Sequence, residues 1–386
     1  MGNRLITYLG YYDIDDNAAQ CRNYVRSATT KMDYIADKLE ELGFEVRIVS
    51  MAGTKLKHRV PGKIFETSPH RETVLFPSMG SGGPIKRRLA KLFMSWHMHK
   101  YLASLGPTDV VLVYHSLGYA DLIKAEKRKQ GFKLVLEVEE FYSDVSGLEK
   151  DARIEGGVFD CADAFICSSE LLADLFSQSE KPCIVCSGVY RLAPRVAADR
   201  GDGKVHVVYA GTLDPRKGGA AAAAAAGALL DASFHVHILG FGREDEVQAI
   251  ESAVTRANEH SMGAKITYDG YKSGVEFTSF IQSCDIGLSP QDPDAKFNTT
   301  SFPSKVFMYL SNGLPVVSVD LPVFRRDDFR DVLFLSDGNK PEALAQTIRT
   351  ASESKATDPS MVMKSLDEEF GSDLNELIKE VSNADR

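Results

Sequence analysis

The chain has 386 residues, of which 44% are hydrophobic and 26% charged, so it is long enough for two ordinary domains. This composition excludes a disordered chain, a collagen-like repeat and a small disulfide scaffold. Lys and Arg number 45 against 54 Asp and Glu, and the net charge of -9 argues against a general nucleic-acid binder.

Short apolar runs rich in β-branched residues recur through the first half of the chain. They stand at 4–9, 45–50, 110–114, 133–138, 163–168 and 183–186, separated mostly by polar, helix-favouring segments. Because parallel strands require crossover connections, the pattern predicts a doubly wound parallel α/β sheet.

One helix of this half, predicted over 84–102, combines basic and apolar side chains. Lys86, Arg87, Arg88 and Lys91 stand beside Leu89, Leu92, Phe93 and Trp96. Such a basic amphipathic helix suits the surface of an anionic membrane, although most helices of this kind pack on their own domain.

The second half repeats the pattern of strands and helices. Apolar runs at 204–210, 233–239, 265–268, 284–289, 315–319 and 332–335 predict another doubly wound sheet. The Pro, Gly and charge content of 190–203 is typical of a linker. We therefore expect domains at 1–195 and 203–360, followed at 361–386 by one or two closing helices.

The segment VVYAGTLDPRKGG (207–219) leaves a strand, turns, and enters an Ala-rich helix. Free N–H groups at a helix start, next to Gly211, Arg216 and Lys217, suit phosphate oxygens, because the helix dipole and the cations both favour negative charge. The alternative is a solvated basic turn.

The segment FNTTSFPSKVFMYLSNGLPVVS (297–318) predicts a loop, a helix over 304–311, a stop at Gly313 and a buried strand. Ser301, Ser304 and Lys305 at the helix start are candidate contacts to a ribose or phosphate. The alternative is a solvated Lys305 on a helix that only packs.

Polar side chains follow two predicted strands of the first half. His115 comes after VVLVY, and Glu139 and Glu140 come after KLVLEV. Carboxyl ends of parallel strands are where ligands bind, so these residues are candidates for contacting an acceptor or assisting proton transfer. The alternatives are a hydrogen-bonded structural histidine and an acidic pair favoured by a helix dipole.

An acidic group follows the first strand, at Asp13, Asp15 and Asp16. It suits a metal-bound nucleotide or a phosphatase, but the Gly-Thr turn that a phosphatase would want is missing, so we favour a polar loop. Asn17, in the same loop, is a candidate ribose or acceptor contact.

The cysteines and the start of the chain indicate a reducing cytoplasm. The cysteines are scattered, and the start lacks the apolar core of a signal peptide. Cys183 and Cys186 occupy one strand on opposite faces, so we expect neither a zinc nor a redox site there. No window approaches the ~20 apolar residues of a spanning helix.

The pair AGTLDPRKGG and FPSKVFMYLSNGLPVVS resembles the donor half of GT-B glycosyltransferases, specifically glycosyltransferase family 4. The segments at 23–50 and 136–145 resemble members of that group that assemble bacterial polysaccharides. The resemblance implies two Rossmann-like domains, an acceptor domain and a donor domain, facing a central cleft.

The resemblance also assigns donor-binding residues. The family binds the donor diphosphate with an Arg, whose position holds Thr212, and a Lys, whose position holds Lys217, so Arg216 is expected to supply the missing charge. The family's two glutamates are replaced by Thr300 and Met308, whereas Pro303-Ser304-Lys305 matches a bacterial variant pattern. Gln291, Asp292 and Asn298 lie in the loop that approaches the donor sugar in the family; the alternative for that loop is a mobile surface segment.

The motifs and the resemblance together predict a hexosyltransferase that uses a nucleotide-diphosphate sugar, expected to be UDP-linked, and a saccharide acceptor in surface polysaccharide or glycoconjugate assembly. The resemblance also implies retention at the anomeric carbon. We expect no metal, no cofactor and no nucleic-acid partner, and a cytoplasmic location with peripheral contact to the inner membrane face through 84–102 if the acceptor is lipid-linked. Two alternatives remain: a non-catalytic subunit that stabilises a transferase, and a nucleotide-sugar epimerase or hydrolase.

Overall fold

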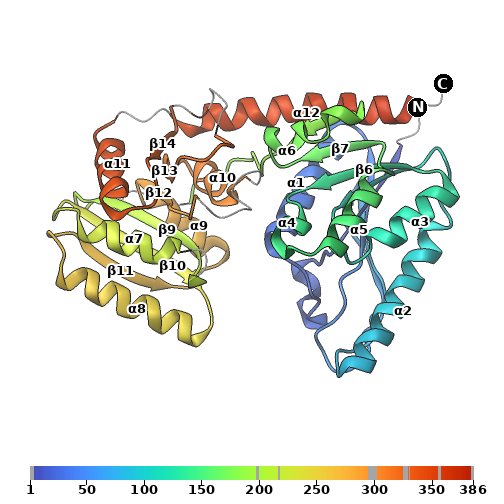
Figure 1. Ribbon diagram of the computed structural model, residues 1–386, viewed down its shortest axis with the longest axis horizontal. Coiled ribbons are helices and arrows are strands. Elements are labelled where there is room, and N and C mark those ends of the chain that lie inside the picture. The colour runs from blue at the N-terminus through green and yellow to red at the C-terminus, as the bar shows by residue number, and fades with distance from the viewer. Residues whose placement is uncertain are drawn as a thin grey trace. The chain divides into compact units, whose positions relative to one another are not determined.

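The chain folds into two units, each built on a mostly parallel sheet with helices on both faces (Figure 1). The computed structural model describes residues 4–196, 200–215, 218–293, 302–324, 329, 331–354 and 358–383, without the side chains of 144 and 145. Unit 1 comprises Met1–Ser187 and Glu369–Arg386, and unit 2 comprises Gly188–Glu368. The segment predicted as a linker therefore groups with unit 2.

The sheet of unit 1 has the strand order β3-β4-β2-β1-β5-β6-β7-β8 in the described residues. All neighbours are parallel except β3 and β4, which form an antiparallel hairpin at the edge. This hairpin was not predicted, because β3 is largely exposed and polar and contains no apolar run. The strands are β1 (Leu5–Gly10), β2 (Glu45–Ser50), β3 (Lys63–Ser68), β4 (Arg71–Leu75), β5 (Val110–Tyr114), β6 (Lys133–Val138), β7 (Ala164–Cys167) and β8 (Cys183–Val185).

The helices of unit 1 cover both faces of this sheet. The helix α1 buries Met32, Ile35 and Leu39, which lie at helical spacing, and the chain turns after it at Gly43, whose φ of 85° suits glycine. The described helices are η1 (Asp15–Gln20), α1 (Arg26–Glu41), α2 (Pro84–Leu102), α3 (Ala120–Gln130), α4 (Tyr142–Ser146), α5 (Glu149–Phe159), α6 (Glu170–Asp174) and η2 (Ser177–Ser179).

The sheet of unit 2 is parallel throughout its described strands, in the order β11-β10-β9-β12-β13-β14. The chain builds outward from β9 through β10 to β11 and then returns to the other side of β9 with β12. The order of the strands therefore reverses between β9 and β12, which is the point where open α/β sheets bind ligands. The strands are β9 (Val205–Thr212), β10 (Phe234–Phe241), β11 (Lys265–Gly270), β12 (Ile286–Ser289), β13 (Val316–Val319) and β14 (Leu333–Ser336).

The Ala-rich helix α7 packs closely on β9 and β10. Ala220, Ala223, Ala224 and Ala226 are buried in a core shared with α8 and α11. Small side chains allow the helix to approach the sheet, as predicted from the alanine run. The helices of unit 2 are α7 (Gly219–Ala228), α8 (Glu244–Glu259), α9 (Gly274–Gln282), α10 (Ser304–Ser311) and α11 (Pro341–Glu353).

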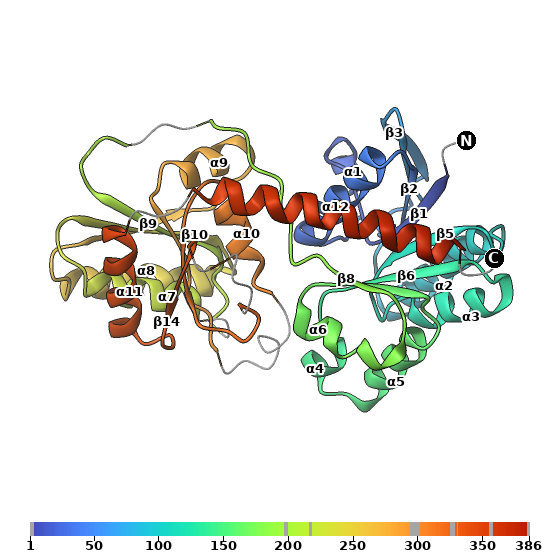
Figure 2. The same cartoon turned by 90° about the horizontal axis from the view of Figure 1, so that it is seen from above.

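The last helix, α12 (Pro359–Asn383), continues without interruption through Gly371 and Ser372 (Figure 2). Its second part belongs to unit 1, where Phe370 is buried and stacks on Tyr34 of α1 with ring centroids 5.7 Å apart. A bilayer-spanning helix is not found in the described part of the chain, because no helix there is both long and apolar enough.

Candidate functional site

Two motifs that lie about 90 residues apart meet at the carboxyl edge of the unit 2 sheet. A Cβ placed on Gly211, near the end of β9, would overlap Cε of Lys305 and lie 3.0 Å from its Nζ. The same ammonium group lies 5.5 Å from the centre of the Tyr209 ring. The absence of a side chain at Gly211 therefore lets a cation of α10 reach the end of β9.

Two helices begin at this edge without a side-chain cap, α7 after β9 and α10 after β12. The N-cap of α7 is Gly218, whose φ of 65° suits glycine. Uncapped N–H groups and the helix dipole attract anions. Both helices thus offer backbone donors on either side of the point where the strand order reverses.

Two hydroxyl oxygens at the same edge lack a hydrogen-bond partner among the described residues. They are Oγ1 of Thr212 at the end of β9 and Oγ of Ser289 at the end of β12, and both atoms are buried. A buried hydroxyl without a partner costs free energy unless a ligand or water satisfies it. The strands β9 and β12 are neighbours in the sheet, so these groups favour a polar ligand at their ends.

Tyr309 attaches α10 to the sheet. Its phenol oxygen accepts a hydrogen bond from the backbone N–H of Ala210, at 2.7 Å, and donates one to the carbonyl of Leu288, at 3.3 Å. Its ring packs over Gly287, where any Cβ would overlap it. Lys305 therefore stands on a helix that is hydrogen-bonded to both β9 and β12.

A pocket of about 180 Å³ lies beside Gly211, at the ends of β9 and β10. Its lining includes Phe241 and Tyr271, whose rings meet edge to face with centroids 5.6 Å apart. Lys272 also lines the pocket, and its ammonium group lies 2.7 Å from Glu276. The pocket thus offers exposed aromatic faces next to the edge that carries Lys305.

The other predicted donor residues fall into two groups. Arg216, Lys217, Asn298 and Ser301 lie outside the described residues. Ser304 is the exposed first residue of α10, and Asp292 is a half-buried residue three positions after β12. The described structure therefore brings together Gly211, Thr212, Ser304 and Lys305 at one edge.

In unit 1, the corresponding edge carries a buried group of charges. Glu137 of β6 is fully buried; it accepts a hydrogen bond from the Tyr8 hydroxyl, and one of its oxygens has no partner among the described residues. The buried Lys31 ammonium lies 3.8 Å from Glu137, forms an ion pair with Glu139, and donates to the carbonyl of Cys186 at 2.7 Å. Glu139 thus lies next to a lysine rather than standing alone.

The pKa values in this group follow from burial and charge. Burial raises the pKa of the Glu137 carboxyl, although Lys31 opposes the shift. Burial alone would lower the pKa of Lys31, but Glu139 and the other negative groups around it raise the value above normal. Lys31 is therefore held as a cation.

His115 is buried, with 2% of its surface exposed. Its Nε2 lies 2.9 Å from Oε1 of Glu155, and this carboxylate also accepts hydrogen bonds from the backbone N–H groups of Tyr142 and Ser143 at the start of α4. These hydrogen bonds, from His115 first, lower the pKa of Glu155 against the effect of burial. This environment fits the alternative interpretation of His115 as a hydrogen-bonded structural histidine.

The remaining polar candidates of unit 1 are Glu140 and the acidic loop that follows β1. Glu140 is half-buried two positions after β6. Asp13 is buried and accepts a hydrogen bond from the Asn17 side chain at 2.9 Å, whereas Asp15 is exposed and lies 3.8 Å from Arg26. Within the described ranges, this loop contains no group of side chains placed to hold a metal.

Sequence reasoning did not find Glu137, Lys31 or Glu155. Glu137 stands inside an apolar run that predicts a strand, and Lys31 stands inside an ordinary helix. Lys31 meets Glu139 across 108 positions of sequence, and His115 meets Glu155 across 40. The only local signal is a carboxylate within a run of buried strand residues.

Comparisons with known proteins identify unit 2. A family model described as glycosyl transferases group 1 matches residues 204–354. These residues form a group 1 glycosyltransferase domain. The match confirms the predicted enzyme class, a glycosyltransferase, at the level of this domain. The matched residues include Gly211, Thr212, Ser304 and Lys305. No curated protein sequence matches the chain.

Solved structures extend the comparison to both units. A sucrose-phosphate synthase from Thermosynechococcus elongatus is 14% identical, with a TM-score of 0.65 over 99% of this chain and 95% of that one. HepE from Anabaena, solved with UDP and glucose, is 14% identical, with a TM-score of 0.64 over 97% and 98%. A UDP-forming α,α-trehalose-phosphate synthase from Burkholderia xenovorans is 10% identical, with a TM-score of 0.65 over 97% and 99%. The predicted GT-B fold is confirmed.

Proposed function

We propose that the protein transfers a hexose from a UDP-linked donor to a saccharide acceptor, with retention at the anomeric carbon. The observation that carries the proposal is the convergence of Lys305, Gly211 and the uncapped start of α7 where the strand order of unit 2 reverses. That the donor is UDP-linked is supported by the similar structures whose descriptions contain UDP.

The geometry suggests how the leaving diphosphate is stabilised. The N–H groups that begin α7 and α10, together with Lys305, would donate to the phosphate oxygens as negative charge develops on them. Arg216 and Lys217, adjacent in sequence to α7, would add positive charge. These groups can neutralise the leaving group electrostatically, so we propose that the reaction does not require a metal at this position.

We place the nucleotide base in the pocket beside Gly211. Phe241 and Tyr271 present aromatic faces on which a planar base can stack, and Lys272 supplies a cation at the same pocket. Asp292, in the loop after β12, and Asn298 are proposed to read the hydroxyls of the sugar. Unit 1 would form the acceptor site. Glu139 and Glu140, which are not fully buried, are the candidates for contacting the acceptor.

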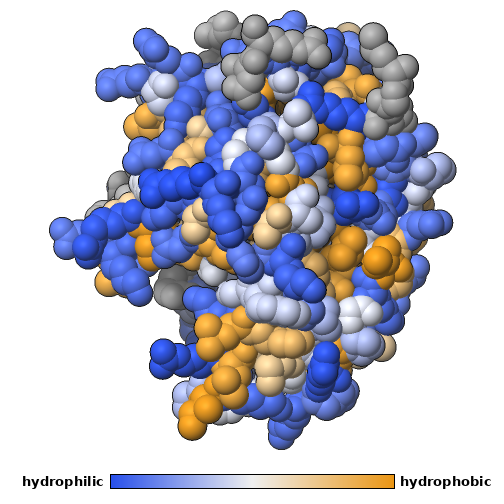
Figure 3. All heavy atoms as spheres, turned by 90° about the vertical axis from the view of Figure 1, so that its right-hand side faces the viewer, coloured by the Kyte–Doolittle hydropathy of each residue, from blue (hydrophilic) through white to orange (hydrophobic). Residues whose placement is uncertain are grey.

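A peripheral contact with a membrane is supported by α2. Four apolar side chains at positions i, i+4, i+7 and i+11 are exposed on one stripe: Ile85 by 79%, Leu89 by 50%, Leu92 by 60% and Trp96 by 51%. The view in Figure 3 shows apolar side chains reaching the surface among hydrophilic ones on the side of unit 1 that carries α2. An exposed apolar stripe flanked by Lys86, Arg87, Arg88 and Lys91 suits an anionic lipid surface and hence a lipid-linked acceptor of the kind used in surface polysaccharide assembly.

The first test is thermal unfolding with UDP, GDP and their sugars. A ligand present at about 100 times its Kd adds about 2.7 kcal/mol and should raise Tm by several degrees. We expect the rise with UDP or one UDP-sugar, and its loss in Lys305→Ala. The matched control is Lys340→Ala, an exposed lysine before α11. If no nucleotide raises Tm, or if Lys305→Ala keeps the full rise, the donor site is wrong.

Turnover then separates the proposal from its alternatives. A transferase releases UDP only when an acceptor is present, a hydrolase or epimerase converts the donor alone, and a non-catalytic subunit converts nothing. The anomeric configuration of the product, measured by NMR, tests retention. Binding of α2 to vesicles with anionic lipid, compared between the wild type and Leu92→Ser, tests the membrane contact.

A further inference from the structure

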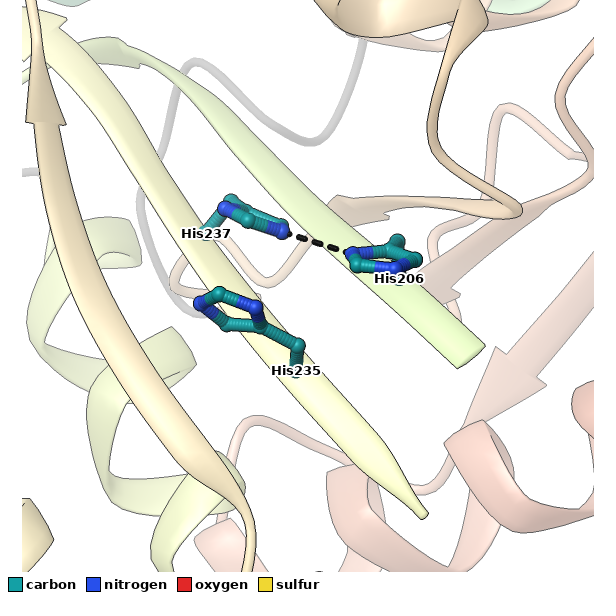
Figure 4. A group of neighbouring side chains, drawn as sticks. All are labelled: His206, His235 and His237. Carbon is teal, nitrogen blue, oxygen red and sulfur yellow. Dashed lines mark hydrogen bonds between the residues drawn. The ribbon is translucent and has the colours of Figure 1, made fainter. Parts of the chain in front are cut away.

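Three histidines gather at the amino ends of the unit 2 strands, the opposite edge from the donor site. His206 lies in β9 and pairs in register with His235 of β10, and His237 lies two residues further along β10. Because side chains alternate along a strand, all three point to one face of the sheet (Figure 4). One ring nitrogen from each lies within 4.8 Å of the others, and His206 and His237 are buried.

Two carboxylates fix which nitrogens of His206 and His237 carry hydrogen. Nε2 of His206 lies 3.0 Å from Oδ1 of Asp202, and Nδ1 of His237 lies 3.0 Å from Oδ2 of Asp269. A carboxylate only accepts hydrogen bonds, so both rings donate from these outer nitrogens. In the neutral form of each ring, the inner nitrogen, Nδ1 of His206 or Nε2 of His237, then carries a lone pair.

Thr267 determines in the same way which ring nitrogen of His235 carries the hydrogen. The Thr267 hydroxyl donates its single hydrogen to Asp269 at 2.8 Å, so it accepts at 3.1 Å from Nε2 of His235. Nδ1 of His235 is then the third nitrogen with a lone pair. Each of the three rings is therefore oriented from outside by an oxygen, which is the arrangement that supports histidine ligands in metal sites.

The inner nitrogens of His206 and His237 lie only 2.9 Å apart. Two lone pairs at this distance repel unless a proton or a cation lies between them. Neutral imidazole is the form that binds metals.

We propose that His206, His235 and His237 bind a single Zn²⁺ ion, with water as a fourth ligand. Tetrahedral nitrogen ligands at 2.0–2.1 Å from zinc lie about 3.3 Å apart. This separation falls between the 2.9 Å from Nδ1 of His206 to Nε2 of His237 and the 4.8 Å within which one ring nitrogen of each histidine lies. Imidazole nitrogens suit zinc rather than Mg²⁺ or Ca²⁺, which prefer oxygen ligands. Asp202 and Asp269 offset the charge of the ion, while the neighbouring Arg200 is occupied by the ring of Phe280 and the carbonyl of Ser283.

The role of this ion is structural. It joins β9 to β10 directly, and through Thr267 and Asp269 it also holds β11. Gly211 and Lys305 lie at the carboxyl ends of the strands, so the ion does not contact the donor. Zinc should therefore raise the stability of unit 2 and leave the affinity for UDP unchanged.

The experiment uses untagged full-length protein stripped with a chelator. We expect Co²⁺ to bind at one ion per chain with the visible absorption of a tetrahedral site, and Zn²⁺ to displace it. Since no cysteine belongs to the cluster, the thiolate charge-transfer band should be missing. Zn²⁺ alone should raise Tm, and Mg²⁺ should not. The lack of a tetrahedral Co²⁺ spectrum in the wild type, or a thiolate band, would overturn the proposal.

Variants then assign the ligands. His235→Ala changes the half-buried ligand and should abolish the Co²⁺ spectrum, while Asp269→Asn should weaken zinc binding about tenfold. The control is His260→Ala, an exposed histidine at the end of α8, which should bind like the wild type. Full binding by His235→Ala would also overturn the proposal. The Tm rise with UDP, measured with and without zinc, keeps this test separate from that of the donor site.

Discussion

The two units have the same kind of sheet but opposite charge at its carboxyl edge. In unit 1, the edge is acidic, and its charged groups are paired with one another: the buried Lys31 lies between the buried Glu137 and the half-buried Glu139. In unit 2, the edge presents Lys305, two helix starts without a side-chain cap, and two hydroxyls that have no partner among the described residues. The unit 1 group is held mainly by its own ion pairs, whereas we propose that an anionic ligand completes the unit 2 group.

This difference shows that the fold alone does not define the site. Both sheets reverse their strand order, in unit 1 between β1 and β5 and in unit 2 between β9 and β12. Near both points, buried polar atoms lack a partner among the described residues, but they differ in kind: a carboxylate oxygen of Glu137 in unit 1, and the hydroxyls of Thr212 and Ser289 in unit 2. Buried charge in unit 1 should therefore affect stability, and charge in unit 2 should affect binding.

The largest effect should come from Lys31→Met. It leaves Glu139 and the buried Glu137 without their cation, and removing one partner of a buried ion pair typically costs 3–5 kcal/mol. Denaturant unfolding measures the loss. The additional change Glu137→Gln should recover part of it, because it removes the buried acid.

A control lysine sharpens this result. Lys124 is partly exposed and lies 3.2 Å from Asp121 on α3. Lys124→Met should cost less than about 1 kcal/mol, as for other surface pairs. Equal losses for the two lysines would contradict the view that the unit 1 group is structurally essential.

Two glycines at the unit 2 edge should separate stability from binding. A Cβ at Gly240 would overlap the backbone carbonyl of Gly211, so Gly240→Ala should cost roughly 1–3 kcal/mol. A Cβ at Gly211 meets the flexible end of Lys305, so Gly211→Ala should cost little stability but weaken UDP binding about tenfold, or about 1.4 kcal/mol. Thermal unfolding and UDP titration check both.

Gly156→Ala in α5 serves as the control for these glycines. Nothing lies within 4 Å of a Cβ at Gly156, and alanine favours a helix by up to about 1 kcal/mol over glycine. This variant should be as stable as the wild type or more so. If Gly211→Ala binds UDP as the wild type does, Lys305 is not a donor contact.

The smallest effect is a pH dependence from Glu155. Its pKa is lower in the folded protein, so the stabilisation is complete above the unfolded value near 4.3 and disappears as pH falls through the folded value. Glu155→Gln should therefore be less stable than the wild type at pH 7, and the difference should narrow below about pH 4. A difference in unfolding free energy that stays constant down to pH 3 would contradict this prediction.

Much of the fold could be predicted because buried parallel strands are continuous apolar runs. Each predicted run contains a strand, and the helix expected at 304–311 spans Ser304–Ser311 and stops before Gly313, whose φ is 83°. The hairpin of β3 and β4 was not predicted, because β3 lies at the edge of the sheet and is exposed and polar. An apolar pattern in the sequence indicates a buried strand, so an exposed strand such as β3 gives little signal.

The site was predictable only where a local motif carries it. Gly211 and Lys305 stand in recognisable segments, but their mutual contact depends on the sheet order. Tyr309 could be identified only as a packing residue, because its hydrogen bonds reach strands far away in sequence. The histidine cluster also combines two strands, although the spacing of His235 and His237 already places them on one face.

The course of α12 has a consequence for how the protein is made. The strands of unit 1 leave the ribosome before those of unit 2, yet the core of unit 1 includes Phe370, Leu374 and Ile378, which are synthesised after all of unit 2. Domains generally fold in order from the N-terminus during synthesis. Here unit 2 can complete its fold before unit 1 does. The apolar surface around Tyr34 in unit 1 stays exposed until α12 has been synthesised and packs on it.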